Sequence, residues 1–364
     1  MGRMTSSGKI AVMIVDDSAI VRKILTETLS SEDDIEVIAT APDPMVALEK
    51  IKHLKPDVLT LDLEMPRMDG LTFLKSLMQS SPLPVIVLSS LAQSASETAL
   101  EALRCGAIDV FAKPSGPYSV GDLRMGICAR IRAAARAKLK SAPQAAPAHL
   151  ACDTTPAHHH DAVIAIGAST GGTEALAALL PALPASTPPV VITQHIPPVF
   201  SATFAARLKR ISRLDVREAR DGDALEAGVA LVAPGGLHML VERSGRHYGV
   251  RVKNGPLVQY QRPSVDVLFA SVAEAAGSHA VGVILTGMGR DGADGLLKMR
   301  RRGARTFAQD EASSVIFGMP REALQIGAAE RAVPLDRMAQ AILSALPDPS
   351  RQSGLSTAVP HPIV

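Results

Sequence analysis

The stretch IAVMIVDD, residues 10–17, places six apolar side chains directly before two aspartates. A strand that is apolar at every position predicts burial on both faces of a parallel sheet, because a half-exposed strand would alternate apolar and polar residues. The aspartates follow at the carboxyl end of this strand, which is the edge where open parallel sheets bind ligands. This stretch therefore predicts a fold class and the place of a site within it.

Four further apolar runs follow, separated by amphipathic stretches: IEVIAT (35–40), DVLTLD (57–62), VIVLSS (85–90) and AIDVFA (107–112). Strands that alternate with helices in this way predict an α/β domain with a five-stranded, doubly wound parallel sheet. We assign this domain to residues 9–132.

A second alternation begins at residue 161 and predicts another α/β domain, residues 161–347, with a mainly parallel sheet. Its expected strands are AVIAIG (162–167), PVVITQH (189–195), VALVAP (229–234), HMLVE (238–242), YGVRV (248–252), AVGVILTG (280–287) and ARTFAQ (304–309). Its expected helices are Gly172–Leu180, Ser201–Arg210, Val265–Ala276 and Ala293–Arg302.

Two segments lack apolar periodicity. Residues 133–160 hold ten Ala, three Pro and four His, and they predict a helix end that runs into a linker. Residues 348–364 are rich in Pro and Ser and predict a disordered tail.

Composition excludes several classes of function. The chain of 364 residues is 47% hydrophobic, but it has no Trp, three Tyr and seven Phe, and its net charge is +2. Few aromatic side chains for base stacking, no broad basic surface and no helix-turn-helix pattern argue against nucleic-acid binding. No apolar run reaches the roughly 18 residues of a membrane span. A polar N-terminus without a signal peptide and three scattered cysteines predict a cytoplasmic protein.

The two predicted domains differ in charge. Residues 9–132 hold 13 basic and 17 acidic residues, whereas residues 161–347 hold 20 basic and 17 acidic residues. Opposite net charges are compatible with docking of one domain on the other, although so small an asymmetry is also typical of ordinary surface composition.

Five polar residues are expected at the carboxyl ends of the strands in the first domain: Asp16, Asp17, Asp62, Ser89 and Lys113. Three carboxylates suit Mg²⁺, a hard cation that prefers oxygen ligands, and a lysine with a hydroxyl suits phosphoryl oxygens. Each residue alone is an ordinary turn, cap or loop residue. The complete set predicts Mg²⁺-assisted phosphorylation of Asp62, with Lys113 and Ser89 in contact with the product.

The segments VDDS (15–18), LDLEMPRMDG (61–70), LSS (88–90) and AKP (112–114) resemble the receiver domain of bacterial two-component response regulators. The resemblance implies a flavodoxin-like fold, Asp62 as the phosphoacceptor, Mg²⁺ held at Asp16, Asp17 and Asp62, and a histidine kinase as the phosphoryl donor. Ser89 stands where the family often has Thr, a change that keeps the hydroxyl.

The segment GASTGG, residues 167–172, follows a predicted strand and opens a predicted helix. Its backbone amides could cradle a phosphate, but neither nucleotide-binding pattern, G-x-x-x-x-G-K-[ST] or G-x-G-x-x-G, is present. Its G-x-S-x-G pattern alternatively places Ser169 on a tight turn as a nucleophile, with helix N-terminal amides near a developing oxyanion. A nucleophilic serine requires a base.

His195 ends the next strand and reaches the same sheet edge as Ser169 if the two strands are neighbours. Either Asp291 or Asp294 could orient its imidazole, and each could instead cap the following helix. The order Ser, His, Asp differs from the Ser, Asp, His order of α/β-hydrolases, so a different fold is expected. The other histidines considered are expected to be surface residues or, in the linker, weak metal binders: His238, His247, His279 and His158–His160.

Six segments of the second domain resemble the catalytic domain of the CheB family of chemotaxis protein-glutamate methylesterases: GASTGG (167–172), QHIPP (194–198), VAPGGLHM (232–239), RPSVD (262–266), ILTGMGRDGADG (284–295) and FGMP (317–320). A receiver, a linker and this domain form the whole architecture of that family. The resemblance implies Ser169 as nucleophile, His195 as base and Asp291 as the residue that orients the base. It also places Thr170 beside the nucleophile and the Met288 amide at the oxyanion.

The same resemblance implies phosphorylation-activated hydrolysis of glutamyl methyl esters on methyl-accepting chemoreceptors, together with deamidation of glutamines. The implied partners are a CheA-type histidine kinase and the chemoreceptors, with no nucleic acid and no membrane insertion, and the esterase site needs no metal. A rival hypothesis is a phosphorylation-switched binding module whose glycine-rich loop docks a partner or an anion. Esterase activity that is lost with Ser169 but kept in Thr173→Ala would distinguish the two.

Overall fold

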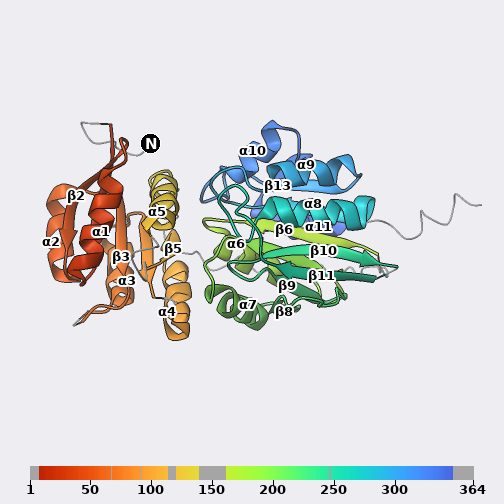
Figure 1. The fold of residues 1–364 in the computed structure, drawn as a ribbon, viewed down its shortest axis with the longest axis horizontal. Coiled ribbons are helices and arrows are strands. Elements are labelled where there is room, and N and C mark those ends of the chain that lie inside the picture. The colour runs from red at the N-terminus through yellow and green to blue at the C-terminus, as the bar shows by residue number, and fades with distance from the viewer. Residues whose placement is uncertain are drawn as a thin grey trace, which may run out of the picture.

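The computed structural model describes residues 8–66, 68–90, 92–113, 120–138, 161–245 and 247–346. These residues form two α/β domains that lie side by side (Figure 1). Most of the predicted linker, including His158–His160, and the predicted tail lie outside the described residues. The domain boundaries assigned from sequence stay predictions.

The first domain has a five-stranded sheet in the order β2-β1-β3-β4-β5, and all neighbouring strands are parallel. Buried side chains of α1 and α5 pack on one face, and those of α2, α3 and α4 pack on the other, which confirms the doubly wound fold. The elements are β1 (Ile10–Val15), α1 (Ala19–Ser30), β2 (Ile35–Ala41), α2 (Pro44–Leu54), β3 (Val58–Asp62), α3 (Gly70–Ser80), β4 (Val85–Ser89), α4 (Gln93–Arg104), β5 (Asp109–Ala112) and α5 (Val120–Ala134).

Local sequence determines where helices begin near the strand ends. Ser18, directly after the two aspartates, caps α1, and Asp69 caps α3 through a 2.8 Å hydrogen bond from a backbone amide. Gly70 is the first residue of α3, and a Cβ there would lie 2.1 Å from the carbonyl oxygen of Asp62. Only glycine therefore allows α3 to start directly against the strand end that carries Asp62.

The second domain has a seven-stranded parallel sheet in the order β14-β13-β12-β6-β7-β9-β8 and a separate antiparallel hairpin of β10 and β11. This confirms the predicted mainly parallel sheet. The elements are β6 (Val163–Ala168), α6 (Gly172–Leu179), β7 (Val190–Gln194), α7 (Phe200–Ile211), β8 (Asp215–Glu218), β9 (Val229–Val232), β10 (His238–Ser244), β11 (His247–Lys253), α8 (Val265–Ala276), β12 (Ala280–Ile284), α9 (Ala293–Arg301), β13 (Arg305–Gln309), α10 (Met319–Gln325), β14 (Arg331–Val333) and α11 (Leu335–Ala345).

Four elements of this domain were not expected from the sequence: β8, β14, α10 and α11. Both strands lie at the edges of the sheet, and their sequences, DVRE and RAV, are too short and too polar to stand out as buried runs. An edge strand is identified by the strand with which it pairs. That pairing exists only in the folded chain, so the sequence alone does not show it.

The centre of this sheet positions the candidate site. From β6 the chain crosses to β7 on one side, whereas β12 pairs with β6 on the other side. Loops at such a change of direction separate at the carboxyl ends of the strands and leave a crevice. The segments that follow β6, β7 and β12 carry Ser169, His195 and Asp291.

The two domains are in contact. In Figure 1, α4 and α5 lie on the side of the first domain that faces the second, and α4 packs against α6 and α7. One cluster of buried apolar side chains includes residues of both domains. Beyond α5, the amide of Lys138 donates to the carbonyl of Val315 at 3.3 Å, and its ammonium lies 3.2 Å from Glu311. The first domain is thus docked on the second, and both apolar packing and the ion pair of Lys138 with Glu311 contribute to the contact.

Candidate active site and phosphorylation site

Three acidic side chains converge at the carboxyl ends of β1 and β3. Asp16, Asp17 and Asp62 each place a carboxylate oxygen within 4.8 Å of the other two. Asp16 and Asp62 are fully buried, whereas Asp17 is exposed. The ammonium nitrogen of Lys113 lies 2.6 Å from Asp62 Oδ2 and 3.6 Å from Asp16 Oδ2. The fold therefore brings four of the five predicted residues into one cluster.

Ser89, the fifth residue, ends the neighbouring strand β4 and is buried. Its carbonyl accepts a 2.8 Å hydrogen bond from the amide of Lys113. Its hydroxyl donates to the backbone carbonyls of Ser90 and Ala95, each at 3.4 Å. Ser89 thus lies at the predicted edge, with its hydroxyl bonded to the backbone at the start of α4.

The electrostatics of this cluster fit a divalent cation. Burial raises the pKa of Asp16 to about 6, and the carboxylate of Asp62 adds to the increase while Lys113 opposes it. Burial also raises the pKa of Asp62, in spite of its ion pair with Lys113. Oxygen ligands that repel one another in a buried position are stabilised when a hard cation binds between them.

Ser169 lies on the tight turn between β6 and α6. Its amide donates to the carbonyl of Thr286 at 3.0 Å, and its own carbonyl accepts a 2.9 Å hydrogen bond from the side chain of Gln194. Gly171 has φ +78°, and a Cβ there would lie 2.6 Å from Cβ of Val315, so the turn requires glycine at this position. Ser169 is only 9% exposed.

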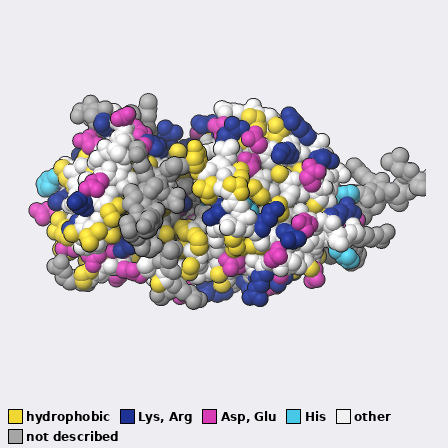
Figure 2. Space-filling model, viewed as in Figure 1, with side chains coloured by type: hydrophobic (Ala, Val, Ile, Leu, Met, Phe, Trp, Pro, Cys, Tyr) yellow, Lys and Arg dark blue, Asp and Glu magenta, His cyan; other side chains and the backbone are white. Residues whose placement is uncertain are grey.

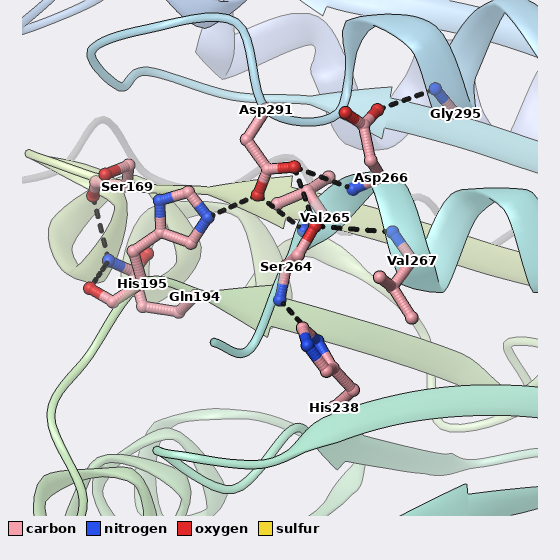
Figure 3. A network of polar contacts seen from close by, with 10 residues as sticks. All are labelled: Ser169, Gln194, His195, His238, Ser264, Val265, Asp266, Val267, Asp291 and Gly295. Carbon is pink, nitrogen blue, oxygen red and sulfur yellow. Dashed lines mark hydrogen bonds and ion pairs between the residues drawn. The ribbon is translucent and has the colours of Figure 1, made fainter. Parts of the chain in front are cut away.

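His195 reaches the same edge because β6 and β7 are parallel neighbours, which is the arrangement on which its prediction depended. Its Nε2 lies 2.8 Å from Oδ2 of Asp291, and both side chains are at most 3% exposed. Its Nδ1 is buried and has no hydrogen-bond partner among the described residues. Figure 3 shows this second ring nitrogen on the side of Ser169.

Asp291 and Asp294, which the sequence left as alternatives, have different surroundings. The carboxylate of Asp294 is 48% exposed and pairs with Arg290 at 2.9 Å. Asp291 instead accepts hydrogen bonds at both oxygens: Oδ1 from the Ser264 hydroxyl (2.8 Å) and the Asp266 amide (3.0 Å), and Oδ2 from His195 and the Val265 amide (2.8 Å). The two amides begin α8, so Asp291 lies at the N-terminus of α8 and not of the helix that follows it.

This environment keeps Asp291 ionised. Burial acts to raise its pKa, but the hydrogen bond from His195 and the amides of Asp266 and Val265 outweigh burial and hold the pKa below its ordinary value. An ionised carboxylate can only accept hydrogen bonds, so the proton between the two side chains is on Nε2 of His195. In a neutral imidazole, Nδ1 then carries the free lone pair on the side of Ser169.

The prediction that His238 is a surface residue is wrong. His238 is 4% exposed, its Nε2 lies 2.8 Å from the carbonyl of Pro256, and its Nδ1 accepts a 3.3 Å hydrogen bond from the amide of Ser264 (Figure 3). The hairpin strand β10 packs against α8, and this contact places its first residue under the start of that helix. His247, in contrast, is exposed as expected.

Sequence reasoning also missed Ser264 as part of the site. A serine directly before a predicted helix is a signal for an N-cap, and Ser264 does accept a hydrogen bond from the amide of Val267. Its second contact, donation to Asp291 27 residues later in the chain, is produced by the fold.

A cavity of about 840 Å³ lies between the two domains, and its walls include Ser169, His195, Met288 and Lys113. Met288 follows Gly287, where a Cβ would lie 2.7 Å from Cβ of Ser169. The backbone that leads into Met288 therefore runs directly beside the serine. The role of the Met288 amide at the oxyanion stays a prediction.

Thr170 makes a contact between the domains. Its hydroxyl donates a 2.7 Å hydrogen bond to Oδ2 of Asp109, at the start of β5 in the first domain. The same strand leads to Lys113, which pairs with Asp62. The backbone from Asp109 to Lys113 thus connects the surroundings of Ser169 with the candidate phosphorylation site at Asp62.

No helix within the described part of the chain is long and apolar enough to cross a membrane.

Comparison with known proteins finds a family match for each of the two domains. Residues 164–342 match the model of the CheB methylesterase family, and residues 12–121 match the response regulator receiver domain. The chain is 52% identical to a protein-glutamate methylesterase/protein-glutamine glutaminase of Syntrophus aciditrophicus, over 92% of this chain and 98% of the relative. It is 51% identical to the protein of that name from Salmonella typhimurium, over 92% and 97%.

Among solved structures, the Thermotoga maritima CheB methylesterase catalytic domain matches with a TM-score of 0.50 and 33% identity, over 51% of this chain and 98% of that domain. The similarity to full-length relatives extends over both domains. The chain therefore belongs to the family of CheB methylesterases that carry an N-terminal response regulator receiver domain.

Proposed function

We propose that this chain is a phosphorylation-activated methylesterase that hydrolyses glutamyl methyl esters on chemoreceptors and deamidates receptor glutamines, in the cytoplasm. One observation carries the proposal: a buried His195 bonded to an ionised Asp291, with its second ring nitrogen unpartnered among the described residues on the side of Ser169. The names of relatives about 50% identical to the chain support the choice of substrate.

The proposed reaction uses Ser169 as the nucleophile and His195 as the base. Nδ1 of His195 takes the proton from the Ser169 hydroxyl while Nε2 stays bonded to Asp291, and the serine oxygen attacks the γ-carbonyl carbon of the ester. The backbone amide of Met288 stabilises the oxyanion, and Thr170 lies beside the nucleophile. Methanol leaves with the proton from His195, and water then hydrolyses the acyl-enzyme in the same way. With a glutamine substrate, ammonia leaves in place of methanol.

In the receiver, a histidine kinase of the CheA type transfers a phosphoryl group to Asp62. Mg²⁺ held by Asp16, Asp17 and Asp62 would neutralise the charge of the incoming phosphoryl oxygens. Lys113, already 2.6 Å from Asp62, contacts the product.

The proposed function is tested by the release of methanol from membranes that hold methylated chemoreceptors, after incubation with the phosphorylated chain. We expect methanol from the parent chain and from Thr173→Ala, which changes a buried residue of the same glycine-rich turn and helix. A chain that binds the receptors but releases no methanol would support the binding-module hypothesis instead.

Asp62→Asn is expected to abolish phosphorylation, because the amide lacks the carboxylate nucleophile. The measurement is incubation with acetyl phosphate and Mg²⁺, followed by mass-spectrometric mapping of the acyl phosphate. Asp33→Asn, which removes an exposed carboxylate elsewhere in the receiver, is the matched control and should label normally. Undiminished labelling of Asp62→Asn would overturn the assignment.

In the unphosphorylated chain, the receiver inhibits the esterase by covering its site. This part of the proposal is supported by the hydrogen bond from Thr170 to Asp109 and by the cavity shared between the domains. Phosphorylation of Asp62 would change the position of Lys113 and of β5, and with it the contact that Asp109 makes.

Asp109→Ala is expected to raise the activity of the unphosphorylated chain by about tenfold or more. A hydrogen bond to a charged acceptor stabilises the closed arrangement by about 1.5–3 kcal/mol, so its loss shifts the population toward the open form. The initial rate of methanol release without phosphodonor measures the effect. Glu49→Ala, an exposed change on α2, is the control. Equal rates for Asp109→Ala and the parent chain would contradict an inhibitory role for this contact.

A further inference from the structure

A small exposed hairpin stands on the rim of the Ser169 cavity and has no part in the proposed reaction. Val258 and Gln261 exchange two backbone hydrogen bonds, at 3.1 and 2.9 Å, across a two-residue turn. The side chain of Tyr260 at the turn is 74% exposed, and Leu257 at its base is 53% exposed. We name residues 257–261 the rim hairpin.

The turn of the rim hairpin has an unusual backbone. Gln259 and Tyr260 have φ values of +50° and +61°, in the left-handed region. Turns with positive φ at both positions favour Asn-Gly, and a bulky aromatic residue is disfavoured there. Residues kept in disfavoured backbone conformations concentrate at functional sites. An exposed tyrosine in this conformation therefore indicates that its ring contacts another molecule.

The rim hairpin is tied to the residues that position the triad. The guanidinium of Arg262 donates to Oδ1 of Asn254 at 2.8 Å and to the carbonyl of Gly255 at 2.6 Å, which fixes the end of the hairpin. Two residues later, Ser264 donates to Asp291. The rim hairpin therefore has a fixed position relative to Ser169, as a recognition element requires.

Leu257 and Tyr260 line the same cavity of about 840 Å³ as Ser169 and Met288. Figure 2 shows hydrophobic side chains gathered on the visible face at the boundary between the two domains. Tyr260 keeps most of its surface exposed while the receiver is docked. The receiver is thus not the partner that covers this ring.

We propose that Leu257 and Tyr260 bind apolar side chains of the protein substrate next to the glutamyl ester that enters toward Ser169. This inference rests on the proposed function. Because Ser169 is only 9% exposed, the ester side chain must reach inward while the substrate backbone and its neighbouring residues stay on the rim. Two exposed apolar side chains at that rim gain free energy when a polypeptide covers them, whereas a small ester leaves them uncovered.

The test compares a protein substrate with a small ester, using the full phosphorylated chain. Tyr260→Asn keeps the turn, because Asn tolerates positive φ, and removes the ring. For methylated receptor membranes, we expect Tyr260→Asn and Leu257→Ala each to lower kcat/KM by roughly 10-fold or more, mainly through KM, as expected from the loss of one buried large side chain. For p-nitrophenyl acetate, kcat/KM should stay unchanged.

Two controls sharpen this comparison. Tyr260→Phe keeps the ring and should retain most of the activity toward receptors. Ile326→Ala removes an exposed apolar side chain that does not line the cavity and should change neither substrate. As a measurement independent of turnover, Ser169→Ala should sediment with methylated receptor membranes more tightly than Ser169→Ala combined with Tyr260→Asn.

Unchanged kcat/KM for receptors in both rim variants, or equal sedimentation in the presence and absence of the ring, would overturn the inference. An equal fall for both substrates would also overturn it, because the rim hairpin would then act through the geometry of the triad. Failure of the proposed function is a separate outcome, since the parent chain itself would then release no methanol.

Discussion

Ser169→Ala is expected to lower methylesterase turnover by about 10⁴-fold or more, because the reaction loses its nucleophile and keeps only substrate binding and oxyanion stabilisation. The substitution removes one hydroxyl from a side chain whose backbone is held by Thr286 and Gln194, so the turn should keep its shape. Single-turnover release of methanol from methylated receptors by the phosphorylated chain measures the loss.

The matched control is Thr173→Ala, which should retain activity and unfold at a similar temperature. Phosphorylation of Asp62 should be normal in both variants, because the receiver is unchanged. Residual activity of Ser169→Ala within about tenfold of the parent chain would show that another group is the nucleophile.

Asp291→Asn is expected to lower kcat by about 10⁴-fold, the loss that follows when the acid of such a triad becomes an amide. Asp291 accepts four hydrogen bonds with its two oxygens. An amide has one oxygen and one NH₂ group, so two of these donors would face another donor. The proton of His195 would then move from Nε2 to Nδ1. A protonated Nδ1 can no longer accept the proton of Ser169.

Asp294→Asn is the control for this prediction, since its carboxylate is exposed and pairs only with Arg290 among the described residues. It should change kcat less than a few-fold. If Asp294→Asn were far more damaging than Asp291→Asn while both variants remained folded, the choice of orienting residue would be wrong. Thermal unfolding of both variants, compared with the parent chain, provides the check on folding.

The carboxylate of Asp291 is also expected to make the stability of the folded chain depend on pH. The pKa of Asp291 in the folded chain lies below its ordinary value of 3.8. A lowered folded-state pKa means that the stabilisation is present above pH 3.8 and is lost as the pH falls through the lower folded-state value. Asp291 therefore contributes to stability throughout the neutral pH range.

The sequence by itself determined the first sheet, the interior strands of the second sheet and the candidate residues at their carboxyl ends. Buried parallel strands such as Ile10–Val15 and Val163–Ala168 are apolar at every position, so they stand out from the helices between them. Ligands bind at the carboxyl ends of such strands, and for this reason Asp62, Ser169 and His195 could be chosen from the chain alone.

Tertiary structure decided the partners of these residues. Asp291 and Asp294 are close in sequence and have the same chemistry. The fold distinguishes them, because His195 and residues 264–266 at the start of α8 bond Asp291, whereas Asp294 pairs with Arg290 at the surface. The burial of His238 under that helix and the hydrogen bond from Thr170 to Asp109 likewise join segments far apart in the chain. Periodicity reports how a residue relates to its own strand or helix, whereas these contacts depend on how separate elements pack, and that is fixed only when the whole core forms.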